Sequence, residues 1–199
     1  MEKDPGYIVE GNTIVINREL TELDLFIKKF IDVLKKHSDY LIVSGFVSIC
    51  SGRTRATEDI DVLVPIMPKG KFKGLFDDLL KNDFWCYQGD DPYAVYSCVE
   101  RFSNVRFAMK GEMFPNIEFV PIDPTKRAKW FEFTNPQKMK IGNFEFKVPP
   151  IEFEILYKEI ILSGKKDIED ARHLRTFFSQ LLKKENFIKF KRIIEHEAE

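Results

Sequence analysis

Hydrophobic residues recur at helical spacing in one segment near the start of the chain. Between Thr21 and about His37, the apolar positions lie on one face of a helix. They are Leu23, Phe26, Ile27, Phe30, Ile31 and Leu34. Thr21 is a suitable N-cap, and Asp24, three residues later, is the acidic partner of a capping box. This segment is therefore predicted to be an amphipathic helix.

Short apolar or alternating runs predict strands in other parts of the chain. We expect strands at residues 12–17, 40–44, 59–64, 104–109 and 116–120, and a hairpin of 138–141 and 143–148 that turns at Gly142-Asn143. Helices are expected at residues 46–50 and 71–80, whereas residues 92–99 fit either a helix or a strand. The mixture predicts an α/β (α+β) fold, in which helices flank a mixed β-sheet.

From Pro150 onward the pattern is helical, with breaks near Ser163-Gly164 and near Lys184. We therefore divide the chain into a core of residues 1–148 and a C-terminal helical segment of residues 149–199, which we expect to pack on the core.

The composition fits a packed domain that carries no overall attraction for polyanions. Hydrophobic residues make up 44% of the 199 residues, and 31 basic residues nearly balance 32 acidic ones. The resulting net charge of -1 marks neither a nucleic-acid binder nor a membrane-surface protein. An anionic ligand would have to be bound by a local cluster.

Two features favour a cytoplasmic protein without a membrane partner. The N-terminus carries acids and no apolar run, and no stretch approaches the roughly 18 apolar residues of a membrane helix. The three cysteines, Cys50, Cys86 and Cys98, include no CxxC pair. Their odd number and spacing argue against both a disulfide framework and a zinc site.

The sequence Asp59-Ile60-Asp61 lies on a predicted strand. Because side chains alternate across a strand, both carboxylates share one face while Ile60 points to the other. Two adjacent carboxylates repel each other unless a cation lies between them. Mg²⁺ suits this position because it binds carboxylate and phosphate oxygens. The alternative is a strand edge whose two aspartates face water.

A second group of residues upstream is suited to phosphate. Gly45 follows a predicted strand and begins a short helix, so a phosphate can approach the backbone there. Residues 51–57 form a loop with two guanidinium groups, of Arg53 and Arg55, and several hydroxyl groups, including that of Thr57. These groups would contact a triphosphate or close the turn.

Taken together, SGFVSICSGRTRATEDIDVLV resembles the signature of the nucleotidyltransferase superfamily, the DNA polymerase beta-like fold. That signature is a small-residue pair after a strand, a short helix, and then Asp-x-Asp. The arrangement of Arg55, Thr57, Asp59 and Asp61 is similar to the minimal nucleotidyltransferases, whose related branches include abortive-infection toxins. The resemblance covers about 20 residues of the chain.

The resemblance implies an NTP substrate with Mg²⁺ or Mn²⁺ held by Asp59 and Asp61. It also implies that Ser44, Gly45, Arg55 and Thr57 bind the nucleotide. One position departs from the family pattern, which usually has Gly-Gly or Gly-Ser at the small-residue pair. Here Ser44 precedes Gly45, and the additional Cβ narrows the approach of a phosphate.

The family's third carboxylate lies on a later strand beside the Asp-x-Asp strand. Glu118 is the preferred match because it is an acid within an apolar strand, where an unpaired charge would be costly. It would help to hold the metal or activate the acceptor hydroxyl. The alternatives are an outward-facing Glu118, or Asp123 in the same role, although Asp123 follows Pro121 and is also suited to capping a helix.

The helical tail resembles the same branch at Lys158, Lys166, Asp167 and Asp170. In the family such residues line or brace the nucleotide cleft, and Lys158 is the one expected to contact a phosphate. Alternatively, Asp167 caps a helix and Asp170 complements its dipole.

These observations predict a Mg²⁺-dependent nucleotidyltransferase with Asp59, Asp61 and Glu118 as catalytic residues. The acceptor, whether protein, RNA or small molecule, is left open. Two alternatives remain. One is a toxin that nucleotidylates tRNA or a protein and is countered by an antitoxin partner. The other is a degenerate member that binds a nucleotide or a partner without catalysis, which Ser44 favours.

Overall fold

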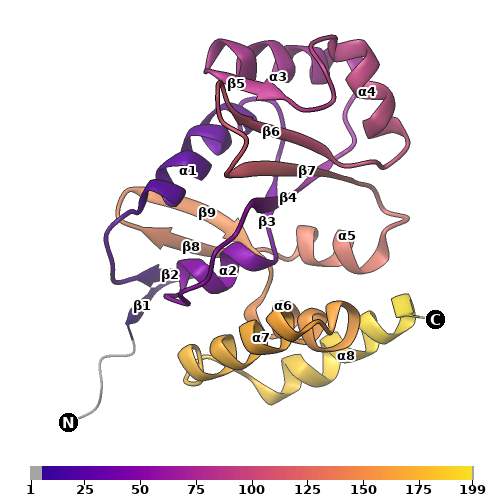
Figure 1. Ribbon diagram of the computed structural model, residues 1–199. Coiled ribbons are helices and arrows are strands. Elements are labelled where there is room, and N and C mark those ends of the chain that lie inside the picture. The colour runs from indigo at the N-terminus through magenta and orange to yellow at the C-terminus, as the bar shows by residue number, and fades with distance from the viewer. Residues whose placement is uncertain (1–5, 199) are drawn as a thin grey trace.

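The computed structural model describes residues 6–198, with side chains to residue 195, and contains two β-sheets and a C-terminal group of helices (Figure 1). The strands are β1 (Tyr7–Glu10), β2 (Thr13–Ile16), β3 (Leu41–Ile42), β4 (Asp59–Pro65), β5 (Phe84–Cys86), β6 (Val105–Met109), β7 (Asn116–Ile122), β8 (Gln137–Ile141) and β9 (Phe144–Val148). The α-helices are α1 (Glu22–Leu34), α2 (Gly45–Cys50), α3 (Lys69–Lys81), α4 (Pro92–Glu100), α5 (Arg127–Thr134), α6 (Ile151–Tyr157), α7 (Lys165–Phe177) and α8 (Lys184–Ala198). A π-helical turn, Lys158–Leu162, continues α6.

Helix α1 begins as its sequence predicts. The Thr21 hydroxyl accepts a hydrogen bond from the Asp24 backbone N–H, and the Asp24 carboxylate accepts one from the Thr21 N–H at 2.7 Å. Arg18 adds two further bonds to the same carboxylate, at 2.5 and 2.9 Å. These four hydrogen bonds stabilise the fully buried Asp24, so the predicted capping box is confirmed.

The larger sheet has the strand order β3-β4-β7-β6-β5. Strands β4 and β7 are parallel, and the other neighbouring pairs are antiparallel, so the sheet is mixed. The smaller sheet, β1-β2-β8-β9, contains the predicted hairpin around Gly142. The α/β class with a mixed sheet and flanking helices is therefore confirmed.

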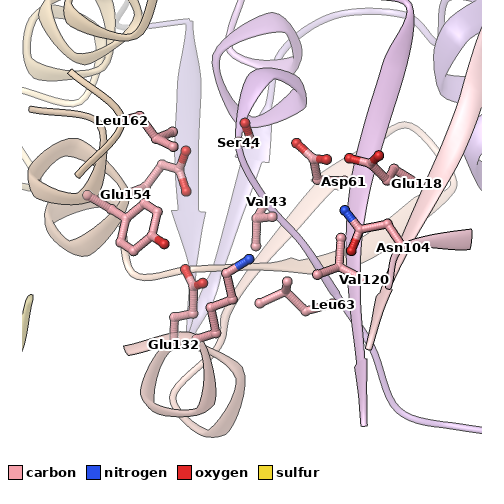
Figure 2. Close-up of a pocket in the computed structure, with 12 residues that line it drawn as sticks. Val43, Ser44, Asp61, Leu63, Asn104, Glu118, Val120, Glu132, Glu154 and Leu162 are labelled. Atoms are coloured by element: carbon pink, nitrogen blue, oxygen red, sulfur yellow. The ribbon is translucent and has the colours of Figure 1, made fainter. Parts of the chain in front are cut away.

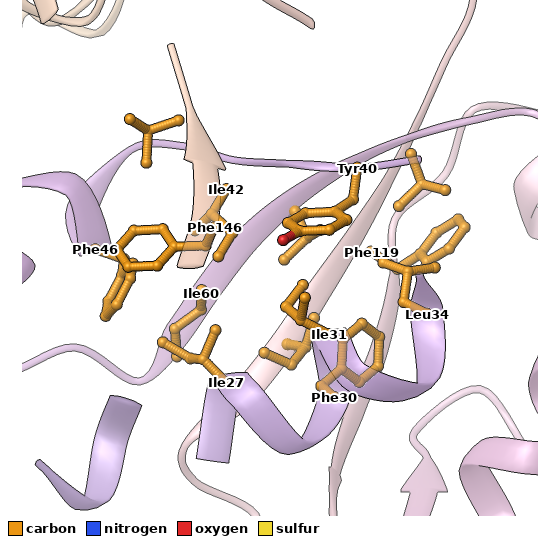
Figure 3. Packing of buried hydrophobic residues seen from close by; sticks show 14 of the residues in the cluster. Ile27, Phe30, Ile31, Leu34, Tyr40, Ile42, Phe46, Ile60, Phe119 and Phe146 are labelled. Atoms are coloured by element: carbon orange, nitrogen blue, oxygen red, sulfur yellow. The ribbon is translucent and has the colours of Figure 1, made fainter. Parts of the chain in front are cut away.

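One face of the larger sheet carries the main hydrophobic core. Ile60 on β4 and Phe119 on β7 point to this face, where they belong to the same buried cluster as Phe30 of α1 (Figure 3). Phe72 of α3 belongs to this cluster as well. All four side chains are almost fully buried. The alternation within β4 therefore sends Ile60 into the core and turns its two aspartates to the opposite face.

The opposite face is apolar in one half and polar in the other. Helix α5 covers the apolar half through Trp130 and Phe133, which pack against Leu63 and Val120. In the polar half, the first residues of β4 and β7 are not covered by that helix. The sheet thus presents the Asp-x-Asp carboxylates beside a covered apolar region.

Helices α6, α7 and α8 lie together at one end of the molecule, below the larger sheet in Figure 1. Within residues 6–198, no helix combines the length and apolar character needed to cross a membrane.

The sequence did not predict β1 or β5, which are short and carry little alternation. Residues 92–99, which fitted either structure, fall within helix α4.

Candidate active site

Asp61 and Glu118 occupy paired positions on the parallel strands β4 and β7. Their carboxyl groups form a hydrogen bond, and burial together with the Glu118 charge raises the pKa of Asp61 to about 7. Two neighbouring acids with little water around them share a proton because both cannot remain ionised at low cost. The pair therefore has the surplus of negative charge that a cation would neutralise.

Asp59 precedes Asp61 on the same face of β4 and is exposed. Its charge contributes to the raised pKa of Asp61. Within the described part of the chain, no group of three or more His, Cys, Asp or Glu side chains is arranged to hold a metal ion. The acids fit Mg²⁺ that takes its remaining ligands from water and phosphate oxygens.

Arg106 contacts Glu118, and the sequence did not predict this contact. Its Nη2 and Nε donate to Glu118 Oε1 at 2.8 and 3.0 Å. Burial raises the pKa of Glu118, but the bonds from Asp61 and Arg106 outweigh it, and the pKa lies below its ordinary value. Glu118 thus remains ionised beside Asp61. The signal available in the sequence was a single arginine between two apolar residues of a predicted strand.

The alternative third carboxylate, Asp123, lies away from this pair. Its side chain accepts hydrogen bonds from the backbone and hydroxyl of Thr125, in the turn after β7. The strand register therefore brings Glu118, rather than Asp123, beside Asp61.

A cavity of about 200 Å³ opens beside the acid pair, between the sheet and the C-terminal helices. Figure 2 shows Asp61 and Glu118 on one side of it and Glu154 on the other. The wall between these acids is mixed. Its apolar part includes Val43, Leu63, Val120, Tyr157 and Leu162, and its polar part includes Ser44, Asn104, Lys129 and Glu132. The cavity can hold a small, partly apolar group next to the carboxylates.

Ser44 lines the same cavity in a backbone conformation that glycine favours. Its φ is 63° and its ψ is -131°, values that cost a residue with a Cβ about 1–3 kcal/mol. The hydroxyl bonds to Asp61 and lowers its pKa, while the Ser44 N–H donates to Glu154. A glycine at this position would avoid the backbone strain, and the serine places an additional hydroxyl beside the acid pair.

Gly45 leaves space that a side chain of this protein occupies. A Cβ at position 45 would lie 2.2 Å from Nη2 of Arg55, so the guanidinium occupies the space that glycine leaves. Arg55 also lines a second cavity of about 250 Å³, together with Thr57, Asp59 and Lys166. The Thr57 hydroxyl donates to the Asp59 carbonyl at 2.8 Å. The predicted nucleotide-binding residues Arg55 and Thr57 thus lie on the Asp59 side of the acids.

Lys158 and Asp170 belong to a buried ionic cluster that the sequence did not predict. The Asp170 carboxylate lies 2.8 Å from Arg53 Nε, without the alignment of a hydrogen bond, 3.0 Å from Arg55 Nη1 and 3.1 Å from Lys158 Nζ. Lys158 also pairs with Glu154 at 3.2 Å and is fully buried. Asp170 therefore braces helix α7 against the loop before β4 instead of only complementing a dipole. Lys158 lines neither cavity beside the acids.

Solved structures with a similar fold are nucleotidyltransferase-like. An antigenic nucleotidyltransferase-like protein from Paracoccidioides brasiliensis matches with a TM-score of 0.50 and 16% identity, over 82% of this chain and 79% of that one. The solution structure of the antibiotic-resistance factor ANT(2'')-Ia matches with a TM-score of 0.49 and 16% identity, over 87% of this chain and 91% of that one. Its crystal structure in complex with adenylyl-2''-tobramycin matches with a TM-score of 0.48 and 12% identity, over 90% and 100%.

No protein-family model matches the sequence, and no curated protein is significantly similar to it. The first structural match and the topology show that the chain has a nucleotidyltransferase-like fold. At 16% identity this likeness concerns the fold alone.

Proposed function

We propose that this protein is a Mg²⁺-dependent nucleotidyltransferase that transfers an NMP group from an NTP to an acceptor hydroxyl. The observation that supports the proposal is the Asp61–Glu118 pair, which lines the first cavity, while Asp59 on the same face of β4 lines the second. Asp59 and Asp61 would hold the ion. A bound Mg²⁺ would neutralise phosphate charge and make the α-phosphorus more electrophilic.

The side chains around the acids would have different roles in the reaction. Arg55, Thr57 and Lys166 would contact the β- and γ-phosphates in the cavity beside Asp59. In the reaction, the acceptor oxygen forms a bond to the α-phosphorus, and the bond from that phosphorus to the β-phosphate oxygen breaks. Pyrophosphate leaves, and the hydroxyl proton passes to the ionised Glu118 and then to solvent.

Two predicted nucleotide ligands have reduced roles in this proposal. Lys158 is bound to Glu154 and Asp170, so we give it a supporting role for the helices around the cleft. The Gly45 backbone lies against Arg55, and a phosphate would contact that guanidinium rather than approach the glycine directly.

The test uses NTPs labelled at the α-phosphate, with Mg²⁺ and the wild-type protein, Asp61→Asn or Asp123→Asn. We expect the wild type and Asp123→Asn to transfer label to an acceptor and Asp61→Asn to lose at least about a hundredfold in rate. Asp123→Asn is the matched control because it removes the charge of a half-buried aspartate outside the site. Undiminished transfer by a folded Asp61→Asn protein would contradict the assignment.

A nucleotide-binding protein without catalysis is the second candidate, and a specific observation favours it. The Arg55 guanidinium fills the space beside Gly45, and Ser44 occupies a position suited to glycine. Thermal unfolding with each NTP separates the two functions. Stabilisation that is the same with and without Mg²⁺, and no label transfer, would support binding alone.

Toxin activity remains a prediction within the first function. It predicts growth arrest when the protein is expressed and relief of that arrest by the product of a neighbouring gene. Arrest by the wild type but not by Asp61→Asn would connect the phenotype with nucleotidyl transfer. Normal growth on expression of an active enzyme would contradict it.

A further inference from the structure

A row of side chains continues from the acid pair to the far edge of the larger sheet. Asp61 pairs with Glu118, Glu118 pairs with Arg106, and the Arg106 carbonyl accepts a hydrogen bond from the Tyr87 N–H at 2.9 Å. These four residues therefore occupy one line across strands β4, β7 and β6 and the end of β5. Cys86 and Phe107 lie on the core face, so their neighbours Tyr87 and Arg106 share the face of the acids.

The far end of this row is aromatic and held in place. Trp85 and Tyr87 are stacked, with ring centroids 4.7 Å apart and an interplanar angle of 18°. The Trp85 indole N–H donates to the Glu112 carbonyl at 2.8 Å, and the Tyr87 hydroxyl donates to the Met113 carbonyl. Both rings are half-buried, so each keeps exposed surface while its orientation is fixed. Trp85 is also the strand partner of the fully buried Ala108 on β6.

The residue types on this surface, an arginine and two aromatic residues, indicate the class of ligand that it would bind. The guanidinium of Arg106 is partly exposed and lies between the aromatic pair and the acids. Arginine planes and aromatic rings are the groups on which nucleobases stack, and such stacking does not require a strongly basic protein.

The aromatic surface lies too far from Asp61 to belong to the proposed NTP site. Tyr87 is three strand spacings from Asp61, or about 14 Å at about 4.8 Å for each spacing. The cavity lined by Val43, Leu63, Val120 and Tyr157 lies directly beside the acids and is available for the donor nucleoside. Trp85 and Tyr87 do not line this cavity, so their surface remains for the acceptor.

We infer that Trp85, Tyr87 and Arg106 form an acceptor subsite that stacks the base of a nucleoside whose hydroxyl is to be nucleotidylated. This inference rests on the proposed transfer reaction and assigns its acceptor class. The nucleobase belongs either to a free nucleoside or to the end of an oligonucleotide. The surface thus extends the site by one nucleoside beyond the reacting phosphorus.

Fluorescence tests binding without requiring the reaction. The chain has two tryptophans, Trp85 and Trp130, so Trp130→Phe leaves Trp85 as the only indole. In this background, adenosine and a short oligoadenylate with a free 3′ hydroxyl are titrated separately, without Mg²⁺. We expect saturable quenching, which Tyr87→Leu weakens about tenfold. Tyr93→Leu, which removes an exposed tyrosine on α4, is the control and should leave the titration unchanged.

The relative response to the two probes identifies the source of the base. Tighter binding of oligoadenylate indicates a polynucleotide end, and equal binding indicates a nucleoside. Absence of quenching by both, or equal quenching in Tyr87→Leu, would overturn the subsite.

Label transfer provides the second readout and separates the subsite from the reaction. Tyr87→Leu should raise the KM for the nucleoside acceptor about tenfold and leave the KM for NTP unchanged. Quenching without transfer to any acceptor would retain the subsite and reject the proposed function. Transfer to glycerol or to a serine peptide as fast as to adenosine would retain the function and reject the subsite.

Discussion

Two acids of this protein, the fully buried Asp170 and the half-buried Asp61, have opposite surroundings. Asp170 has three basic groups within 3.1 Å, from Arg53, Arg55 and Lys158. Asp61 instead has a second acid, Glu118, as its hydrogen-bond partner, and Asp59 close by. A buried carboxylate surrounded by cations braces the fold, whereas one surrounded by carboxylates retains unbalanced charge that a ligand can neutralise. We therefore expect the residues around Asp170 to stabilise the fold and the acids around Asp61 to bind a ligand.

Removal of the Asp170 charge should have the largest effect on stability. Asp170→Asn would leave three neighbouring basic groups without their shared acid, and we expect it to lower the free energy of unfolding by about 3–5 kcal/mol. Asp61→Asn relieves repulsion between acids, so its free energy of unfolding should equal or exceed that of the wild type. Urea unfolding of both variants measures the comparison. Equal destabilisation by the two substitutions would remove the distinction between the clusters.

Lys158 tests whether the ionic cluster also binds substrate. Lys158→Met would leave Glu154 and Asp170 without its ammonium, and we expect a loss of about 3 kcal/mol in unfolding free energy. Because the lysine is fully buried, the KM for NTP should remain within about twofold of the wild-type value at a temperature where the variant is folded. A KM raised tenfold or more would show that Lys158 contacts phosphate, as the sequence resemblance implied.

Ser44 connects the two clusters, since its hydroxyl bonds to Asp61 and its N–H to Glu154. Ser44→Gly removes the strain of a positive φ and should stabilise the fold by about 1 kcal/mol. Ser44→Ala retains the strain but also lacks the hydroxyl, and is the matched control. Thermal unfolding distinguishes them, and a Ser44→Gly protein that is less stable than Ser44→Ala would contradict the strain argument.

Substitution of Asp24 should have a smaller effect, which concerns the pH dependence of the free energy of unfolding. Burial raises its pKa, but the hydrogen bonds from Arg18 and Thr21 outweigh this, and the pKa in the folded protein is below the ordinary value. The stabilisation is therefore present above the unfolded pKa and is lost as the pH falls through the folded pKa. Unfolding of the wild type should become easier below about pH 4, with a shallower pH dependence in Asp24→Asn. Equal slopes for the two proteins would contradict this assignment.

Local pattern was sufficient for some parts of the site and insufficient for others. The two-residue period of a strand placed Asp59 and Asp61 on one face, and the apolar residues around Glu118 identified it as the candidate on a second strand. The partners of these residues depend on strand register and on contacts between distant segments. Arg55 and Asp170 are 115 positions apart, and nothing in either local sequence specifies that they meet.

The same limit applies to Arg106 and Ser44. Arg106 reaches Glu118 only because β6 and β7 pair in one particular register. Ser44 was recognised as a departure from the family's glycine, but its positive φ and its hydrogen bond to Asp61 are properties of the folded backbone. Composition and periodicity contain no information about either contact.

The central claim is that Asp61 and its neighbours hold a divalent cation together with an NTP. Calorimetric titration of Mg²⁺ into the protein with a non-hydrolysable NTP analogue tests it most directly, with wild type, Asp61→Asn and Asp123→Asn compared. We predict that Asp61→Asn binds Mg²⁺ at least about tenfold more weakly than the wild type, while Asp123→Asn binds it equally. Equal Mg²⁺ affinity in the wild type and Asp61→Asn would contradict the account.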